Sequence, residues 1–266
     1  MKKLLTKLVL LATLVPAAAG ASEFEPKEDA VDACPGDFFT QGARVFGALK
    51  ICATENVPPE KLEHAARVAA AWLDNDLNGR ADELRLISSL KSAGATLIMS
   101  ADGFSGDALD TVMADADAGG FVIHDLSAAE TAPETGRDVS QKEIHHLIVT
   151  AGWARAFPRI FSDVPEDRST VFRLWQKAEA KGYYSYDDET CDDACKAVEF
   201  HYLAAAAYLG SEADLQTGEL KLPDRAALKR RLPGMVKVFQ SGRYKYPRQH
   251  WPDGNYQFDK AIEFTP

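Results

Sequence analysis

The sequence lacks a long hydrophobic run beyond its first residues. Only the segment from Leu4 to Val15 is mainly apolar. It is too short to span a bilayer, because a spanning helix needs about 20 consecutive apolar residues. Lys2 and Lys3 precede this run and Ala19-Gly20-Ala21 follows it, as in a secretory signal peptide. We therefore predict a signal peptide at residues 1–21, a periplasmic or secreted mature protein, and no membrane span after cleavage.

The chain also lacks a basic, aromatic-rich patch. It contains 30 Lys and Arg residues against 40 Asp and Glu residues, and its formal net charge is −10. An acidic surface of this kind repels phosphate backbones. We therefore expect no nucleic-acid partner. A Gly-x-Ser-x-Gly segment is absent as well, which argues against a serine hydrolase of the α/β type.

Cysteine is scarce, but its number is even. The four residues are Cys34, Cys52, Cys191 and Cys195. In an exported protein an even number favours disulfides over metal ligands, so we predict the two local pairs Cys34–Cys52 and Cys191–Cys195. The alternative is a zinc site that uses the Cys191-x3-Cys195 spacing, although a second nearby cysteine pair is missing.

The order of segments predicts an α+β fold. Short apolar segments alternate with helical segments up to residue 127, whereas helical patterns dominate from residue 138 onward. We predict an α/β part at residues 22–127 and a mainly helical part at 138–266, joined by a loop at 128–137. We expect strands at 43–53, 95–100 and 121–126, helices at 61–73, 83–92, 106–114, 140–152, 168–181, 198–210 and 224–232, and turns and loops at 244–256.

The segment between the first two predicted helices has the spacing of half a calcium loop. Oxygen-bearing side chains occupy positions 1, 3, 5 and 9, and glycine occupies position 6: Asp74, Asp76, Asn78, Asp82 and Gly79. Position 12 holds Arg85 instead of the bidentate glutamate of an EF-hand. The spacing predicts bound calcium in a structural role. The alternative is a turn rich in Asp and Asn that forms without metal.

Two predicted helices each carry glutamate and histidine. Glu143 precedes His146 by three residues, a spacing that brings both side chains to one face of a helix. The second helix offers Glu199 and His201. These residues are candidate ligands for zinc or another divalent transition metal. His145 is a further candidate, although it lies about 100° around the helix from His146.

A structural interpretation of the first helix is also open. Ser140 and Glu143 have the spacing of a capping box, in which the glutamate side chain accepts a backbone N–H bond at the helix start.

The same segments resemble a family of zinc peptidases. Lys142-Glu143-Ile144-His145-His146 resembles the motif His-Glu-x-x-His, with Lys142 in place of the first histidine. Val198-Glu199-Phe200 is similar to the helix that supplies the glutamate ligand in the gluzincin clan. Gly152-Trp153 is similar to the Gly-Tyr pair that follows the first helix in lethal-factor-like peptidases. The resemblance covers about residues 140–205.

The resemblance implies a helical region, one zinc ion and peptide or protein substrates. Glu143 would be the general base, and His146 and Glu199 would be two of three zinc ligands. Lys142 cannot ligate zinc while it is protonated, so His145, His201 or the pair Asp187 and Asp188 would have to complete the site. Otherwise the protein would be a non-catalytic relative.

Two functions follow from these patterns. The first is an exported metal-binding protein that resembles a zinc-dependent hydrolase or peptidase and whose catalytic centre is degenerate. The second is a secreted, non-enzymatic binding or interaction protein that calcium and disulfides stabilise.

Overall fold

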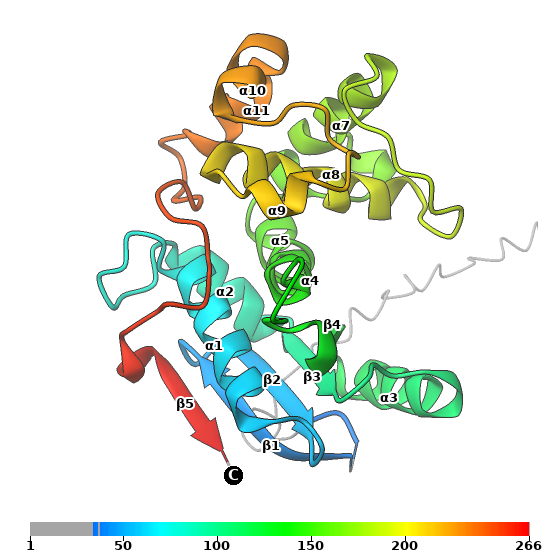
Figure 1. Cartoon of the computed structure of the whole chain (residues 1–266), viewed down its shortest axis with the longest axis vertical. Coiled ribbons are helices and arrows are strands. Elements are labelled where there is room, and N and C mark those ends of the chain that lie inside the picture. The colour runs from blue at the N-terminus through cyan, green and yellow to red at the C-terminus, as the bar shows by residue number, and fades with distance from the viewer. Residues whose placement is uncertain (1–33, 37, 266) are drawn as a thin grey trace, which may run out of the picture.

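The computed structural model describes residues 34–36 and 38–265. The predicted signal peptide at residues 1–21 lies outside the described residues. Figure 1 shows the sheet and helices α1 to α3 in the lower half of the molecule and helices α7 to α11 in the upper half, with α4 and α5 between them. The α+β prediction is confirmed. Among the described residues, no helix is both long enough and apolar enough to cross a membrane.

A five-stranded mixed sheet forms the lower half. Its order is β4-β3-β2-β1-β5, with parallel pairing of β2 with β3 and of β3 with β4, and antiparallel pairing of β1 with both β2 and β5. The strands are β1 Phe39–Val45, β2 Leu49–Thr54, β3 Thr96–Ser100, β4 Ile123–Ser127 and β5 Ile262–Thr265.

The single strand predicted at 43–53 is wrong, because the chain reverses within it. Phe46 and Gly47 have positive φ angles of 50° and 62°, and the Ala48 N–H donates to the Val45 carbonyl at 3.0 Å. Positive φ at both central residues is the geometry of a tight hairpin turn. One apolar segment therefore supplies both β1 and β2, and β3 and β4 follow where strands are expected.

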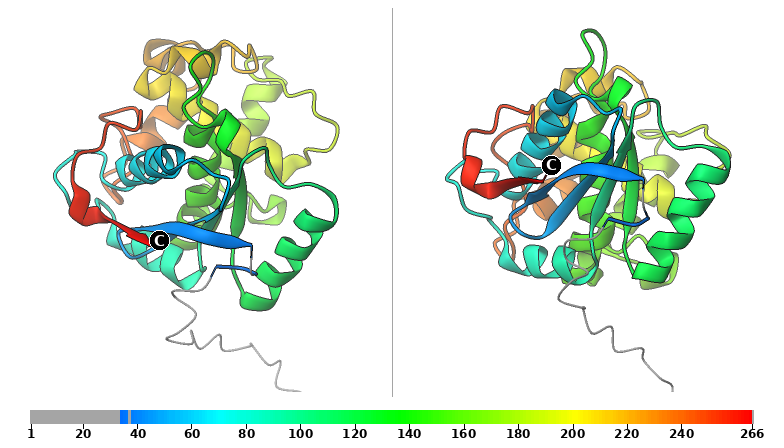
Figure 2. Two further views of the ribbon diagram at one scale, coloured as in Figure 1. Left: turned by 60° about the horizontal axis from the view of Figure 1, so that its bottom comes forward. Right: turned by 90° about the horizontal axis from the view of Figure 1, so that it is seen from below.

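Helices cover both faces of the sheet (Figure 2). On one face lies α1 Pro59–Leu73, whose apolar stripe includes Leu62, Ala66 and Ala69. On the other face, Val112 of α3 Gly106–Gly119 packs on Cys52 and Ile98. Helix α2 is Leu84–Ser92.

The second half is mainly helical. Its elements are the 3-10 turns η2 Ala128–Glu130 and η4 Pro165–Asp167, α4 Val139–Leu147, the π-helical segment η3 Ile148–Trp153, α5 Ala154–Ala156, α6 Pro158–Phe161, α7 Thr170–Ala180, α8 Asp193–Leu209, α9 Glu212–Leu215, α10 Arg225–Arg231, α11 Pro233–Phe239 and the 3-10 turn η5 Asp259–Ala261. The final strand β5 then returns to the sheet beside β1. One hydrophobic core runs through both halves.

Gly152 does not end the helix that begins at Val139, contrary to prediction. The helix continues through η3 into α5. A Cβ atom at Gly152 would lie 2.4 Å from Leu86 Cδ1 and 3.0 Å from Leu90 Cδ2. The glycine therefore permits α2 to pack directly against η3.

Both predicted disulfides are present. Cys34 is bonded to Cys52, and Cys191 is bonded to Cys195, so the zinc alternative for the second pair is wrong. Disulfides of this kind persist in oxidising compartments, which indicates a location outside the reducing cytoplasm.

Candidate metal centre

Helix α4 begins one residue before Ser140, which the predicted capping box would make the N-cap. Asp138 is the N-cap, and its carboxylate accepts the Ser140 N–H at 3.1 Å and the Ser140 hydroxyl at 2.6 Å. His64 Nε2 lies 2.6 Å from the same carboxylate. The capping-box interpretation of Ser140 and Glu143 is therefore wrong, and the Glu143 side chain is free to face the neighbouring strand β4.

Three candidate ligands converge where β4 meets α4. Glu143 Oε2 lies 3.6 Å from His124 Nδ1 and 3.8 Å from His146 Nδ1. Each residue offers a ligand atom, and these atoms lie within 4.8 Å of one another. Atoms bonded to one zinc ion at about 2.0–2.1 Å would lie about 3.3 Å apart in a tetrahedron, so small side-chain shifts would bring all three to one ion.

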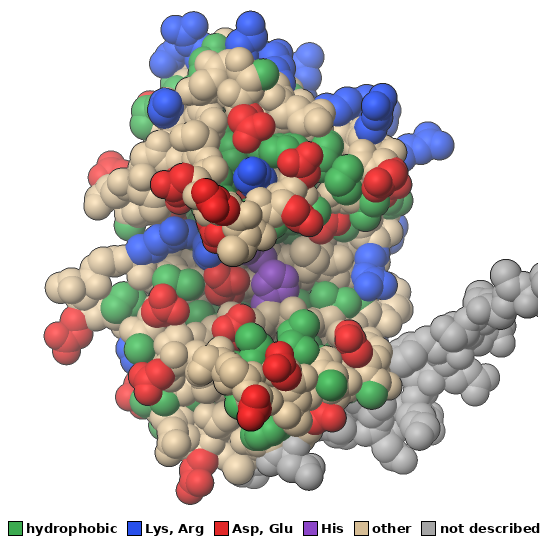
Figure 3. All heavy atoms as spheres, turned by 90° about the vertical axis from the view of Figure 1, so that its right-hand side faces the viewer, with side chains coloured by type: hydrophobic (Ala, Val, Ile, Leu, Met, Phe, Trp, Pro, Cys, Tyr) green, Lys and Arg blue, Asp and Glu red, His purple; other side chains and the backbone are tan. Residues whose placement is uncertain are grey.

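The three side chains of this group differ in how far solvent reaches them. Figure 3 shows a histidine side chain in a hollow that crosses one face, with acidic side chains above and below it. The side chains of His124 and Glu143 are 25% and 19% exposed, whereas that of His146 is 7% exposed. An ion could therefore reach the group from solvent past His124 and Glu143, with His146 on its buried side.

Lys142 joins the two glutamates of the predicted site. Its Nζ atom lies 3.0 Å from Glu143 Oε1 and 3.2 Å from Glu199 Oε1. Burial favours the neutral amine, but the two carboxylates hold the pKa of Lys142 well above its usual value. A charged ammonium group therefore lies beside Glu199, in the region where the peptidase resemblance would put the zinc ion.

The surroundings keep Glu143 ionised and His146 neutral. Burial alone would raise the pKa of Glu143, but the neighbouring His124 and Lys142 lower it below its usual value. Burial, followed by the charges of Lys142 and His124, lowers the pKa of His146 well below its usual value. A carboxylate and a neutral imidazole are the protonation states that bind metal.

Glu199 lies close to His146 but outside the group of three. Its Oε2 atom is 3.6 Å from His146 Nε2, and this nitrogen is buried without a hydrogen-bond partner among the described residues. Burial raises the pKa of Glu199, and Lys142 offsets this only in part. The helices α4 and α8 thus bring the imidazole and the carboxylate together, as the resemblance implies, with a lysine beside them.

His145 and His201 lie in an aromatic cluster instead. His145 Nε2 is 3.0 Å from the Tyr246 hydroxyl, and the two imidazole rings are 5.0 Å apart. The His201 ring stacks on Phe161 at 5.5 Å, and neither of its nitrogens has a partner in the described part of the chain. Neither histidine belongs to a group of three potential ligands among the described residues.

His124 was not predicted as a ligand. It lies in the apolar segment 121–126 that becomes β4, where it is the only titratable side chain besides Asp125. A single histidine on a predicted strand is weak evidence for a metal ligand. Only the fold shows that α4, with its further ligands, lies beside this strand. The Thr150 hydroxyl lies 3.5 Å from His124 Nε2, which leaves Nδ1 toward Glu143.

The predicted calcium loop is folded through hydrogen bonds. The Asp74 carboxylate accepts the Asn78 and Gly79 N–H groups at 3.1 and 2.7 Å and the Tyr256 hydroxyl at 2.7 Å. Asp82 accepts the N–H group of Asn75 at 2.8 Å. Side-chain hydrogen bonds of this kind are typical of turns rich in Asp and Asn.

Three carboxylates of this loop are nevertheless close together. Asp74, Asp76 and Asp82 offer oxygen atoms within 4.8 Å of one another. Burial and the negative charges of Asp76 and Asp74 raise the pKa of Asp82. A cation would relieve this repulsion.

No family model, no curated protein and no solved structure matches this chain.

Proposed function

We propose that this chain is an exported metal-binding protein. His124, Glu143 and His146 hold one divalent transition-metal ion, zinc in the first instance. The observation that supports this most directly is the approach of Glu143 Oε2 to the Nδ1 atoms of both histidines, at 3.6 and 3.8 Å. Two imidazoles and one carboxylate form a common zinc ligand set, and they leave a fourth position for water or another ligand.

Lys142 supports this arrangement through the other oxygen of Glu143. It binds Oε1 at 3.0 Å, which leaves Oε2 for the ion and fixes the direction of the carboxylate. In this site Glu143 is a ligand and not a general base. We therefore propose a periplasmic or secreted binding protein built on a zinc-peptidase-like pair of helices, without peptide hydrolysis.

A second position for the ion is supported by one contact. His146 Nε2 and Glu199 Oε2 are 3.6 Å apart, a separation that also suits two ligands of one zinc ion. An ion there would correspond to the gluzincin-like hydrolase, with Glu143 as the general base and a peptide or protein as the substrate. Lys142 would have to move away from Glu199 before the ion could bind.

Metal titrations of two variants distinguish these positions. The purified chain is stripped with chelator, and zinc or cobalt binding is measured by calorimetry and by the cobalt absorption spectrum. If the ion binds at the proposed site, His124→Gln lowers the affinity by about 10–100-fold or more and Glu199→Gln leaves it nearly unchanged. The reverse pattern would favour the position beside Glu199. The exposed His250→Gln variant is the matched control.

The assay for hydrolysis uses Glu143→Gln. The binding-protein proposal would be contradicted if the zinc-loaded wild type cleaves peptides and Glu143→Gln loses this activity but still binds zinc. An absence of metal binding in the wild type would overturn both positions.

Calcium binding is a second proposed function, at Asp74, Asp76 and Asp82. The mutual proximity of the three carboxylates supports it, and such an ion would stabilise a secreted binding protein together with the disulfides. Calcium in the millimolar range should raise the Tm of the wild type and of the surface control Asp110→Asn, but not that of Asp76→Asn. An equal response of all three proteins would show that calcium does not bind at this loop.

A further inference from the structure

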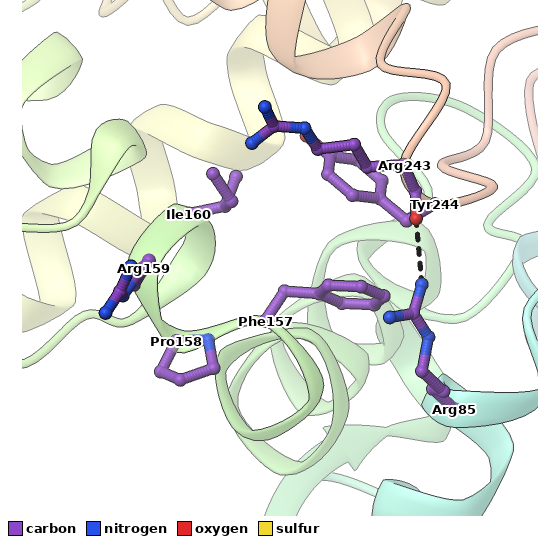
Figure 4. A pocket seen from close by; sticks show the side chains of 7 residues that line it. All are labelled: Arg85, Phe157, Pro158, Arg159, Ile160, Arg243 and Tyr244. Atoms are coloured by element: carbon purple, nitrogen blue, oxygen red, sulfur yellow. Dashed lines mark hydrogen bonds between the residues drawn. The ribbon is translucent and has the colours of Figure 1, made fainter.

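A cavity of about 400 Å³ lies between α2, α6 and the loop that follows α11. Figure 4 shows the rings of Phe157 and Tyr244 facing it, with Arg85 on one side and Arg243 on the other. Its volume falls within the range of about 300–1,000 Å³ that is usual for small-molecule sites. Most of the lining surface is apolar, and none of the described lining residues is Asp or Glu.

The charge of this cavity is opposite to that of the chain. The formal net charge is −10, yet three of the lining residues are arginines, Arg85, Arg159 and Arg243. Arg85 is paired with Glu83 at 3.2 Å. The guanidinium groups of Arg159 and Arg243 make no ion pair with a carboxylate anywhere in residues 34–36 and 38–265. Two cations thus remain available to a bound anion.

The aromatic floor of the cavity is held in place. The Phe157 and Tyr244 ring centroids are 5.0 Å apart, and Tyr244 is 5% exposed with its hydroxyl donated to the Val238 carbonyl at 2.8 Å. Arg85 lies over the Phe157 ring at 4.1 Å and donates to the Arg243 carbonyl at 2.8 Å. These contacts tie α2 to the loop and preform the floor before any ligand binds.

We propose that this cavity binds a small organic anion with an apolar body and one carboxylate group. The flat rings of Phe157 and Tyr244 contact the apolar body. Arg243 donates to the carboxylate, because guanidinium matches a carboxylate with two parallel N–H bonds. Arg159, at the outer rim in Figure 4, adds positive charge along the approach. This site does not involve the metal-binding residues.

The test compares three probes by calorimetry at low salt. 2-Naphthoate carries both the ring and the carboxylate, 2-naphthamide lacks the charge, and inorganic phosphate lacks the apolar body. We expect 2-naphthoate to bind about tenfold more tightly than the amide, as a charge-assisted hydrogen bond predicts, and phosphate to bind more weakly than either. Equal affinity for the acid and the amide, or tighter binding of phosphate, would overturn the proposal.

Variants locate the binding to this cavity. Arg243→Gln should remove most of the preference for the acid, Arg243→Lys should restore part of it, and the exposed control Arg230→Gln on α10 should leave it intact. Circular dichroism verifies that each variant is folded. A preference that survives in folded Arg243→Gln would show that the carboxylate binds elsewhere and would refute the assignment.

Discussion

Lys142 places a positive charge between two carboxylates that are largely removed from water. The side chains of Glu143 and Glu199 are 19% and 9% exposed, and that of Lys142 is 20% exposed. Groups in such surroundings depend on one another, because an unpaired buried charge is costly.

We expect Lys142→Met to lower the free energy of unfolding by about 2–4 kcal/mol at pH 7, because it leaves two carboxylates facing each other without a cation. The loss should shrink at pH 4, where the carboxylates can take up protons. Urea unfolding at both pH values measures this, with the exposed Lys91→Met on α2 as the control. The same loss at both pH values would indicate that packing, not charge, is responsible.

Three buried histidines should make the free energy of unfolding depend on pH. Burial lowers the pKa of His145 and His146 well below the usual value, and that of His201 to about 3. The unfolded chain takes up these protons below about pH 6.5, but the folded chain does not. The unfolded state then binds more protons, so stability falls as the pH decreases from 6.5 toward the folded pKa values.

The share of this pH dependence that comes from His201 can be measured separately. In chelator, between pH 6.5 and 5, each neutral buried histidine contributes up to about 1.4 kcal/mol per pH unit. His201→Phe keeps an aromatic ring in the stack with Phe161 and should reduce the slope by about this amount. Chemical unfolding at several pH values gives the slopes; an unchanged slope would mean that His201 titrates similarly in both states.

At the scale of the element, the π-helical segment η3 links helix α4, which carries the candidate ligands Glu143 and His146, to the core. It follows His146 by two residues and packs against α2 at Gly152. π-Helical turns are rare and occur often at functional sites. The close approach of η3 to α2 anchors the C-terminal end of the helix that carries Glu143 and His146.

Gly152→Ala should destabilise the protein by about 1–3 kcal/mol, because the added Cβ would meet Leu86 at 2.4 Å and force α2 away from η3. Gly242→Ala is the matched control, since nothing lies within 4 Å of a Cβ atom there. Thermal and urea unfolding compare the two. A neutral Gly152→Ala variant would show that the Leu86 side chain rearranges without cost.

At the scale of the whole molecule, the two disulfides should contribute unequally. Cys34–Cys52 closes a loop with a sequence separation of 18, and Cys191–Cys195 one with a separation of 4. In the chain-entropy account a loop of about 15 residues contributes about 3 kcal/mol and a shorter loop less. Replacing both Cys34 and Cys52 by Ser should therefore lower the unfolding free energy more than replacing Cys191 and Cys195. Equal losses would contradict this ranking.

The sequence predicts the local parts of this fold better than the distant contacts. Both disulfides are short in sequence, and α1 to α3, β3 and β4 follow from periodicity over a few turns. The hairpin at Phe46 was missed because an aromatic residue rarely takes a positive φ. Strand β5 was missed because four residues carry little pattern of their own and are specified by pairing with β1.

In the candidate site, too, the local features could be predicted from the sequence and the distant contacts could not. The pairing of Glu143 with His146 comes from helical spacing, and Glu199 was a candidate both from its own predicted helix and from the resemblance. His124 joins them only through the packing of α4 on β4, which no local pattern encodes. The sequence shows that Lys142 replaces the first histidine ligand of the motif. The position of its ammonium group between Glu143 and Glu199 could not be predicted, because it depends on the packing of α4 against α8.

Because β5 pairs with β1, more than 200 residues separate two adjacent strands of one sheet. A chain that lacks residues 262–265 therefore exposes the outer backbone groups of β1. This bare edge can pair with another chain. Deletion of residues 262–265 should therefore favour aggregation over a merely shortened fold.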